Sequence, residues 1–102
     1  MFNKTISIIG GTGHVGLPLG LMFAEKKYKV QLIDIDTKNI NKVNKGIMPF
    51  KEDRANIILK NQIKKKKILA SKNLELVKSS KYIIICIGTP VNKKLQPETK
   101  NF

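Results

Sequence analysis

Cysteine, histidine and tryptophan are almost missing from this sequence, which has one cysteine, one histidine and no tryptophan. A single cysteine excludes an internal disulfide framework, and Cys86 and His14 together cannot supply the ligands of a cysteine-rich zinc site. The longest apolar run, from Tyr82 to Gly88, is far short of the roughly 20 residues that span a bilayer. The first residues also lack the layout of a signal peptide. We therefore expect a cytoplasmic protein with no metal site and no membrane partner.

Acidic residues and arginine are scarce beside lysine. Twenty basic residues stand against seven acidic ones, a formal net charge of +13, and Arg54 is the only arginine. Such a charge raises nucleic acid or an anionic membrane surface as a partner. Specific base recognition, however, favours the guanidinium group of arginine, and no aromatic residue interleaves with the densest lysine run, Lys64 to Lys67. The other lysines are scattered and accompany abundant isoleucine and asparagine, as in an organism-wide compositional bias. The lysines are therefore either solvated side chains on helix faces or part of an electrostatic docking surface. We expect no specific nucleic-acid partner.

The chain is also short, because 102 residues and 11.5 kDa leave room for one small domain. They cannot also hold the second, substrate-binding domain that most two-substrate enzymes need. A hydrophobic content of 41% is enough for a packed core and predicts a globular domain.

Short β-branched runs alternate with amphipathic segments along the chain. Strands are predicted at Thr5 to Ile9, Val30 to Ile35, Ile68 to Ala70 and Tyr82 to Ile87, the last of them fully buried. Helices are predicted from His14 to the polar cluster Glu25 to Lys27, from an Asp36 or Thr37 cap to a stop at Gly46 and Pro49, from Glu52 to about Lys66, and over Leu74 to Lys78. This order predicts an α/β fold with a parallel sheet.

A G-x-G-x-x-G pattern lies between the first predicted strand and the first predicted helix, and it comprises Gly11, Thr12, Gly13, His14, Val15 and Gly16. In such a turn Gly11 permits the tight bend, Gly13 removes a side chain that would block a pyrophosphate, and Gly16 lets the helix pack closely. Phosphates would lie at the helix N-terminus, whose unpaired N–H groups and dipole favour an anion. The pattern predicts a nucleotide-binding turn, with a purely structural βαβ turn as the alternative. His14 either donates to a phosphate or is only solvated.

An acidic residue follows the glycine turn at the expected distance. Asp34 ends the second predicted strand, 18 residues after Gly16. A carboxylate at this place accepts the hydroxyls of the adenine-side ribose, and its charge repels a 2′-phosphate, so it favours NAD over NADP. Asp36 is a rival, but its position next to Thr37 at a helix start makes a capping role simpler.

A second contact region is predicted at the end of the fourth strand, which should lie beside the first and open a crevice at their carboxyl ends. Gly88, Thr89 and Pro90 would line this crevice, and we expect Thr89 to contact the cofactor. The alternative is a plain strand-ending turn. Cys86 lies inside the apolar run with no basic residue near it in sequence, so we interpret it as a buried core thiol and not as a nucleophile.

Taken together, these residues resemble the UDP-glucose/GDP-mannose dehydrogenase family of NAD-dependent nucleotide-sugar dehydrogenases. The resemblance covers nearly the whole chain, and its last segment is similar to the UDP-N-acetylmannosamine dehydrogenase branch. The matching segments are GTGHVGLPL at Gly11 to Leu19, DID at Asp34 to Asp36, VNKGIMP at Val43 to Pro49, CIGTPVN at Cys86 to Asn92 and LQPE at Leu95 to Glu98.

The resemblance implies a Rossmann-like, doubly wound parallel sheet that is incomplete, and a cofactor site for NAD at Gly11 to Gly16, Asp34 and Thr89. It also implies oxidation of a nucleotide sugar's primary alcohol to a carboxylate, with two NAD per sugar and a thiohemiacetal on a cysteine. The family's catalytic cysteine, its lysine and its sugar-binding domain lie downstream of the matched part, so we assign no catalytic residue here. Two departures are His14 in place of the usual tyrosine and Asn39 in place of a basic residue near the adenosine phosphate.

From this resemblance we expect residues 1–102 to be the partial N-terminal NAD-binding domain of a nucleotide-sugar dehydrogenase, either a truncated gene or a fragment. The chain alone should be inactive, and a UDP-sugar should bind only to a full-length enzyme. The alternatives are a small regulatory module that binds NAD or an adenine nucleotide, and a basic nucleic-acid-binding protein. A sheet that ends with its fourth strand leaves an apolar edge, so homo-oligomers are plausible.

Overall fold

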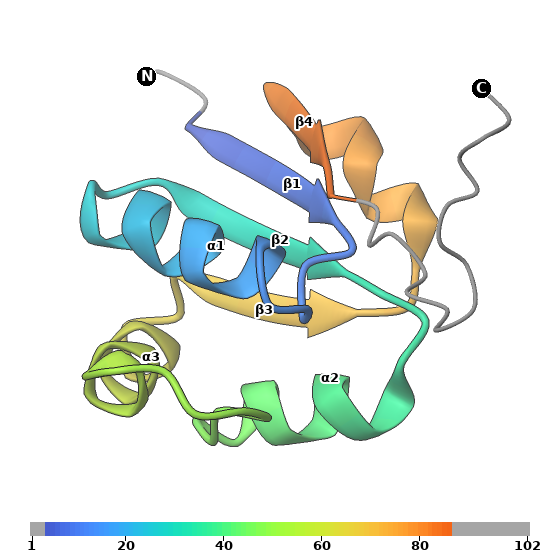
Figure 1. The fold of residues 1–102 in the computed structure, drawn as a ribbon. Coiled ribbons are helices and arrows are strands. Elements are labelled where there is room, and N and C mark those ends of the chain that lie inside the picture. The colour runs from blue at the N-terminus through green and yellow to red at the C-terminus, as the bar shows by residue number, and fades with distance from the viewer. Residues whose placement is uncertain (1–3, 87–102) are drawn as a thin grey trace, which may run out of the picture.

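The computed structural model describes residues 4–86, which form an open parallel sheet with helices on both faces (Figure 1). The elements in chain order are β1 (Thr5–Ile9), α1 (Gly16–Glu25), β2 (Lys29–Ile33), α2 (Thr37–Asn44), α3 (Ala55–Lys64), β3 (Ile68–Ser71), the 3-10 helix η1 (Leu74–Ser79) and β4 (Tyr82–Ile85). The predicted order of strands and helices is confirmed.

The sheet has the strand order β3-β2-β1-β4, and all of its pairs are parallel. The chain thus starts in the middle of the sheet, adds β2 and β3 on one side, and returns to place β4 beside β1. All four carboxyl ends therefore meet at one edge of the sheet, where β1 and β4 flank the point at which the winding direction reverses.

The two faces of the sheet are covered differently. Ile8 and Leu32 point toward α1, which packs so closely that the Cβ of an alanine at Gly20 would lie 2.8 Å from Leu32 Cδ2. On the opposite face the hydroxyl of Ser7 hydrogen-bonds Gln31 and Ser80, at the end of η1. The apolar core lies between the sheet and the α1, α2 and α3 layer, and its fully buried side chains include Ile6, Ile8, Leu17, Val30, Leu32, Val43 and Leu59.

Two predicted boundaries are corrected near the glycine turn. The first helix begins at Gly16 and not at His14, and its hydrogen-bond ladder starts with Leu17 N–H donating to the Gly13 carbonyl. The second strand ends at Ile33, and the side chain of Ile35 is 88% exposed. The strand stops there because the N–H groups of Ile35 and Asp36 both donate to Asp34 Oδ1, which bends the chain away from β1.

The prediction of a fully buried fourth strand is wrong. Ile83 and Ile85 are 49% and 60% exposed, and Tyr82 is exposed as well. An apolar run predicts a strand with both faces covered, but among the described residues the helices lie over β1, β2 and β3, and β4 forms an edge of the sheet. An apolar strand edge is therefore present, as the sequence predicted.

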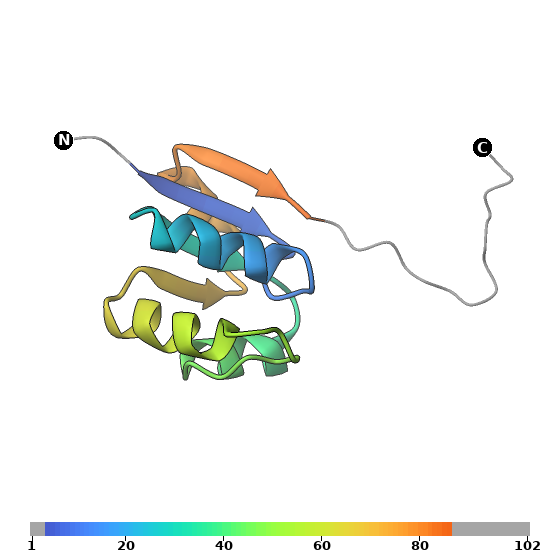
Figure 2. The ribbon, with the colours of Figure 1, turned by 60° about the vertical axis from the view of Figure 1, so that its left-hand side comes forward.

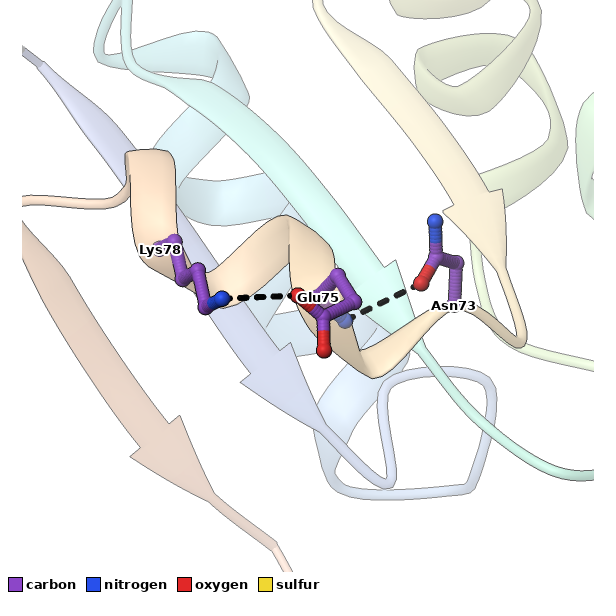
Figure 3. Close-up of polar contacts among 3 residues, drawn as sticks. All are labelled: Asn73, Glu75 and Lys78. Carbon is purple, nitrogen blue, oxygen red and sulfur yellow. Dashed lines mark hydrogen bonds and ion pairs between the residues drawn. The ribbon is translucent and has the colours of Figure 1, made fainter.

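The connection from β3 to β4 runs through η1, which Figure 3 shows in detail. Asn73 caps this turn because its Oδ1 accepts the N–H of Glu75, and Glu75 pairs with Lys78 at 2.8 Å. Both partners of that ion pair are largely exposed, so its contribution to stability is small. Among residues 4–86 no helix is long and apolar enough to cross a membrane.

Candidate nucleotide-binding site

The turn after β1 is anchored on the neighbouring strands. The N–H groups of Gly10 and Gly11 both donate to the Ile33 carbonyl, at 2.8 and 3.1 Å. Gly10 has a φ of +81°, and a Cβ at this position would overlap the carbonyl oxygen of Cys86. Only glycine combines this conformation with this close approach of β4. The sequence prediction placed the tight bend at Gly11, whereas the left-handed residue is Gly10.

The three glycines of the motif have different surroundings. A Cβ on Gly11 would lie 2.8 Å from the Leu32 backbone, and one on Gly16 would overlap the Gly10 carbonyl oxygen. These two glycines are therefore needed for packing. A Cβ on Gly13 would have one neighbour, Gly10 O at 3.6 Å, and would otherwise point into open space. Gly13 thus leaves room for an external group to approach the backbone.

This open space belongs to a cleft of about 430 Å³ at the carboxyl edge of the sheet, within the size range of small-molecule sites. It is lined by Gly10, Gly13, His14, Val15, Gly16, Asp34 and Cys86. A second cleft of about 440 Å³ shares Gly10, Asp34 and Cys86 with it and extends over the apolar side chains of Ile33, Ile35 and Leu74. The first cleft thus presents backbone of the glycine turn and the Asp34 carboxylate, and the second presents mainly apolar side chains together with Lys72.

The N-terminus of α1 borders the first cleft through Val15 and Gly16. No described side chain caps this helix end, and its first turn contains no acidic residue. Its free N–H groups and the positive end of its dipole therefore remain available to an anion such as a phosphate.

Asp34 lies across the cleft from the glycine turn and is held by four donors. Its Oδ2 accepts the N–H and the hydroxyl of Thr12, at 3.0 and 2.8 Å, and its Oδ1 accepts the N–H groups of Ile35 and Asp36. Partial burial acts to raise the pKa of Asp34, but these hydrogen bonds outweigh it and hold the pKa below its ordinary value of 3.8. Asp34 is thus a fixed carboxylate, charged at neutral pH, at the side of the cleft.

Thr12 lies behind the cleft and not in it. Its side chain is fully buried, and its hydroxyl points at Asp34. The Thr12 carbonyl accepts the side-chain amide of Asn39, whose own N–H donates to Asp36 Oδ1. Asp36 is therefore the cap of α2, as predicted. Asn39, which replaces a basic residue of the family pattern, ties α2 to the glycine turn through its side-chain amide. Sequence reasoning missed this contact and the bond from the Thr12 hydroxyl to Asp34.

His14 is exposed at the mouth of the cleft and stacks on Phe50, with ring centroids 4.1 Å apart and an interplanar angle of 22°. Phe50 comes from the connection between α2 and α3, so this stack brings a distant loop to the glycine turn. Neither of the two predicted roles of His14 anticipated this contact. Val15 is 69% exposed and lines the same cleft.

Cys86 differs in part from its predicted place. It packs against the core but is only half-buried, because it also lines both clefts beside Gly10. Thr89, with Gly88 and Pro90, lies outside the described residues. The structure therefore brings Gly11 to Gly16 and Asp34 together. The contact of Thr89 with the cofactor stays a prediction.

A Thr12→Val substitution tests how Asp34 is held. Because the folded-state pKa of Asp34 lies below its unfolded value, its hydrogen bonds stabilise the fold above pH 3.8 and lose this effect as pH falls through the folded-state pKa. Thr12→Val should therefore cost about 1 kcal/mol at neutral pH and less in acid, where the carboxyl is protonated. Chemical denaturation across this pH range measures the difference, with Thr12→Ser as the control that keeps the hydroxyl. An equal cost at both ends of the range would contradict the assignment.

The sequence of the chain is similar to that of known nucleotide-sugar dehydrogenases. Residues 4–102 match the UDP-glucose/GDP-mannose dehydrogenase family, NAD binding domain. The chain is 34% identical over 82 residues to a UDP-N-acetyl-D-mannosamine dehydrogenase of Pyrococcus horikoshii, covering 80% of this chain and 20% of that protein. It is 35% identical over 91 residues to the UDP-glucose 6-dehydrogenase TuaD of Bacillus subtilis, covering 88% and 20%. The chain thus spans about a fifth of the length of these curated relatives.

Solved structures agree with the sequence matches. A ternary complex of GDP-mannose dehydrogenase from Pseudomonas aeruginosa superimposes with a TM-score of 0.81 at 26% identity, over 87% of this chain and 20% of that one. The UDP-D-ManNAc dehydrogenase of Pyrococcus horikoshii gives 0.80 at 32% identity, over 87% and 21%. The predicted Rossmann-like fold is confirmed. The chain belongs to the UDP-glucose/GDP-mannose dehydrogenase family and corresponds to its NAD-binding domain.

Proposed function

We propose that this chain is the NAD-binding part of a nucleotide-sugar 6-dehydrogenase, which oxidises the primary alcohol of a UDP-sugar to a carboxylate. On its own it binds NAD and does not oxidise a sugar. One observation carries the proposal: the open backbone at Gly13 and the ionised Asp34 face one cleft, beside the uncapped N-terminus of α1. These are the three features that a dinucleotide needs from a βαβ unit.

The residues of the cleft have separate tasks toward the cofactor. The N–H groups at the start of α1 bind the pyrophosphate, and Gly13 lets the backbone approach it. Asp34 accepts the hydroxyls of the adenine-side ribose, and its charge disfavours a 2′-phosphate in that place. The apolar cleft over Ile33, Ile35 and Leu74 accommodates the adenine ring. When bound, NAD supplies the hydride acceptor of the oxidation.

We assign the oxidation itself to a complete enzyme, for two reasons. The similar dehydrogenases are at least four times as long as this chain, because the 82 and 91 aligned residues make up only 20% of each. Moreover, Cys86 lies in the wall of both clefts, where we propose that the cofactor binds. The basic side chains that line these clefts with it are His14, which stacks on Phe50, and Lys72 in the second cleft. The UDP-sugar is therefore a partner of the longer enzyme and not of these 102 residues.

Titration of the 102-residue chain in a calorimeter tests this proposal. We expect NAD to bind, NADP to bind at least about tenfold more weakly because of Asp34, and UDP-glucose or UDP-N-acetylmannosamine not to bind. A mixture of NAD and either sugar nucleotide should give no reduced cofactor. Absence of heat on NAD addition to a folded sample would overturn the assignment of NAD binding to this chain. Formation of reduced cofactor would overturn the assignment of sugar oxidation to a longer enzyme.

Among residues 4–86 no strand pairs with the outer edge of β4, and this edge supports self-association of the isolated chain. Changing Ile83 to lysine should abolish concentration-dependent association in sedimentation velocity, because a charge on an edge strand opposes strand pairing. The folded state should lose little stability, since Ile83 is half exposed. Ile57→Lys, at an exposed apolar position on α3, is the matched control. Equal association of both variants would contradict a role for β4.

A further inference from the structure

The parallel sheet gathers lysines at the edge opposite the clefts. Each strand begins at or directly after a lysine: Lys4 before β1, Lys29 in β2, Lys67 before β3 and Lys81 before β4. The backbone ladder places them side by side, because Lys29 N–H donates to the Lys4 carbonyl, Val30 N–H to the Lys67 carbonyl and Lys81 N–H to the Thr5 carbonyl. In Figure 1 the arrows of β1, β2, β3 and β4 all point the same way, so the strands start at one edge of the sheet.

A second row of lysines lies beside the first. Helices α1 and α3 run antiparallel to the strands, so the turns that follow them reach the same end of the molecule (Figure 2). These turns contain Lys26 and Lys27 after α1, and Lys64, Lys65 and Lys66 at the end of α3. We call the two rows the lysine pole, and its nine members are Lys4, Lys26, Lys27, Lys29, Lys64, Lys65, Lys66, Lys67 and Lys81.

The lysine pole holds most of the chain's excess charge. Its nine lysines are accompanied by one acid, Glu25, a net charge of +8, whereas the other eight cations and five acids between residues 4 and 86 leave only +3. Eight of the nine lysines are exposed, and Lys67 is half-buried. Within the described residues none of them forms an ion pair, since the single salt bridge joins Lys78 to Glu75. The lysines that look scattered in the sequence are thus concentrated and unneutralised.

Two lysines of the pole occupy backbone positions that lysine does not favour. Lys27 and Lys66 have φ values of 75° and 59°, in the left-handed region that favours glycine and asparagine. At the end of α2 the equivalent position is occupied by Gly46, with a φ of 79°, beside Lys60 of α3; outside the lysine pole, Arg54 also has a positive φ, of 61°. A compositional bias toward lysine and asparagine would allow asparagine at these two positions, and asparagine adopts the left-handed conformation more readily than lysine. Lysine is therefore present at the two pole turns at a conformational cost.

We propose that the lysine pole is a docking surface for an anionic phospholipid bilayer. Two adjacent rows of ammonium groups at one end of a sheet present a broad surface of point charges, and each such charge near an anionic membrane contributes to binding. Docking at this end leaves the nucleotide clefts, at the opposite end of the strands, facing water. The surface is independent of NAD binding and goes beyond the proposed function.

Nucleic acid is the weaker fit to the same charge. The pole contains no arginine, whose planar fork reads bases and phosphates, because Arg54 lies at the other end of α3. The ring of Tyr28 is engaged by Phe23 and by Lys4, 5.6 Å from its centroid, and is not free to stack on a base. The expectation of no membrane partner rested on the missing spanning segment, which does not bear on binding at a membrane surface.

Vesicle co-sedimentation of the 102-residue chain tests the proposal. The pole variant combines Lys27→Gly and Lys66→Gly, which relieve the left-handed backbone, with Lys64→Gln and Lys65→Gln. The control removes four charges at the other end, through Arg54→Gly at another left-handed position, Lys38→Gln, Lys51→Gln and Lys72→Gln. Vesicles of phosphatidylcholine with a third of phosphatidylserine are compared with pure phosphatidylcholine, at low and at high salt.

We expect binding to the anionic vesicles alone, weakened by high salt, with a roughly 30-fold loss in the pole variant and less than about threefold in the control. The thermal stability of the pole variant should equal or exceed that of the wild type, which excludes misfolding as the cause of the loss. Equal losses in the two variants, binding to neutral vesicles, or no binding at low salt would overturn the proposal. Tighter binding to a DNA duplex or single-stranded RNA than to the vesicles at the same salt would also overturn it, in favour of a nucleic acid.

Discussion

Changing Gly16 to alanine should destabilise the chain by about 3 kcal/mol and lower its Tm by roughly 12 to 24 °C. The added Cβ would overlap the Gly10 carbonyl oxygen and lie 2.9 Å from the Cα of Gly11. Both neighbours are backbone atoms, and Gly10 cannot move freely because it is pressed against β4 and bonded to Ile33. The whole turn must therefore shift to accommodate a single methyl group.

Thermal unfolding followed by circular dichroism measures this effect, and Gly20→Ala in the same helix is the matched control. The nearest atoms to a Cβ at Gly20 are the side-chain methyl groups of Leu32 and Val30, at 2.8 and 3.3 Å, and these can rotate. Alanine also has a better helix propensity than glycine by about 1 kcal/mol, so the control should change little. A Gly16→Ala protein as stable as the Gly20→Ala protein would contradict the close packing of the turn.

Changing Gly13 to alanine, in contrast to Gly16→Ala, should weaken NAD binding without lowering the stability of the fold. The new Cβ would meet only Gly10 O at 3.6 Å, which is an ordinary contact, and it would project into the cleft. Obstruction of the pyrophosphate there removes hydrogen bonds to a charged group, worth about 1.5 to 3 kcal/mol, so NAD affinity should fall roughly 10- to 100-fold.

Calorimetric titration with NAD measures the affinity, and the Tm of the same sample shows whether the fold is intact. The Tm should be unchanged or slightly raised, because alanine lowers the entropy of the unfolded chain. If Gly13→Ala binds NAD like the wild type, the pyrophosphate does not lie against this part of the turn. The pair of Gly13 and Gly16 thus separates the binding role of the motif from its packing role.

Local sequence patterns were sufficient for the order of elements and for the members of the turn. The β-branched run Thr5 to Ile9 matches β1 at both ends, and Asp36 caps α2 as expected from its place before Thr37. Such signals act within a few residues, so one sequence contains them in full. The position of Asp34 beside the glycine turn could be predicted for the same reason, because its distance from Gly16 follows from the length of one βαβ unit.

Contacts between distant segments could not be predicted in this way. The hydrogen bonds that join Thr12 to Asp34 and to Asn39 span 22 and 27 residues, and the stack of His14 on Phe50 depends on the path of the loop after α2. The left-handed φ of Gly10 arises from its contact with Cys86, which is 76 positions later in the chain. Burial of β4 was overestimated because an apolar run does not reveal whether a neighbour covers it.

The charge distribution illustrates the same limit. Counting residues gives the net charge, but only the parallel register brings Lys4, Lys29 and Lys67 into one row. In an antiparallel sheet of the same strands, alternate lysines would lie at opposite ends. An electrostatic surface that looks like compositional bias in the sequence therefore becomes visible only with the fold.

In the proposed function, the Asp34 carboxylate holds the adenine-side ribose of NAD, and NAD and NADP titrations that compare Asp34→Asn with Asp53→Asn test this role. Asp53, an exposed acid in the loop before α3, controls for the loss of one negative charge. Asp34→Asn should bind NAD at least about tenfold more weakly than the wild type and should lose most of the preference over NADP, while Asp53→Asn keeps both properties. Undiminished NAD affinity and an unchanged preference in a folded Asp34→Asn protein would contradict the account.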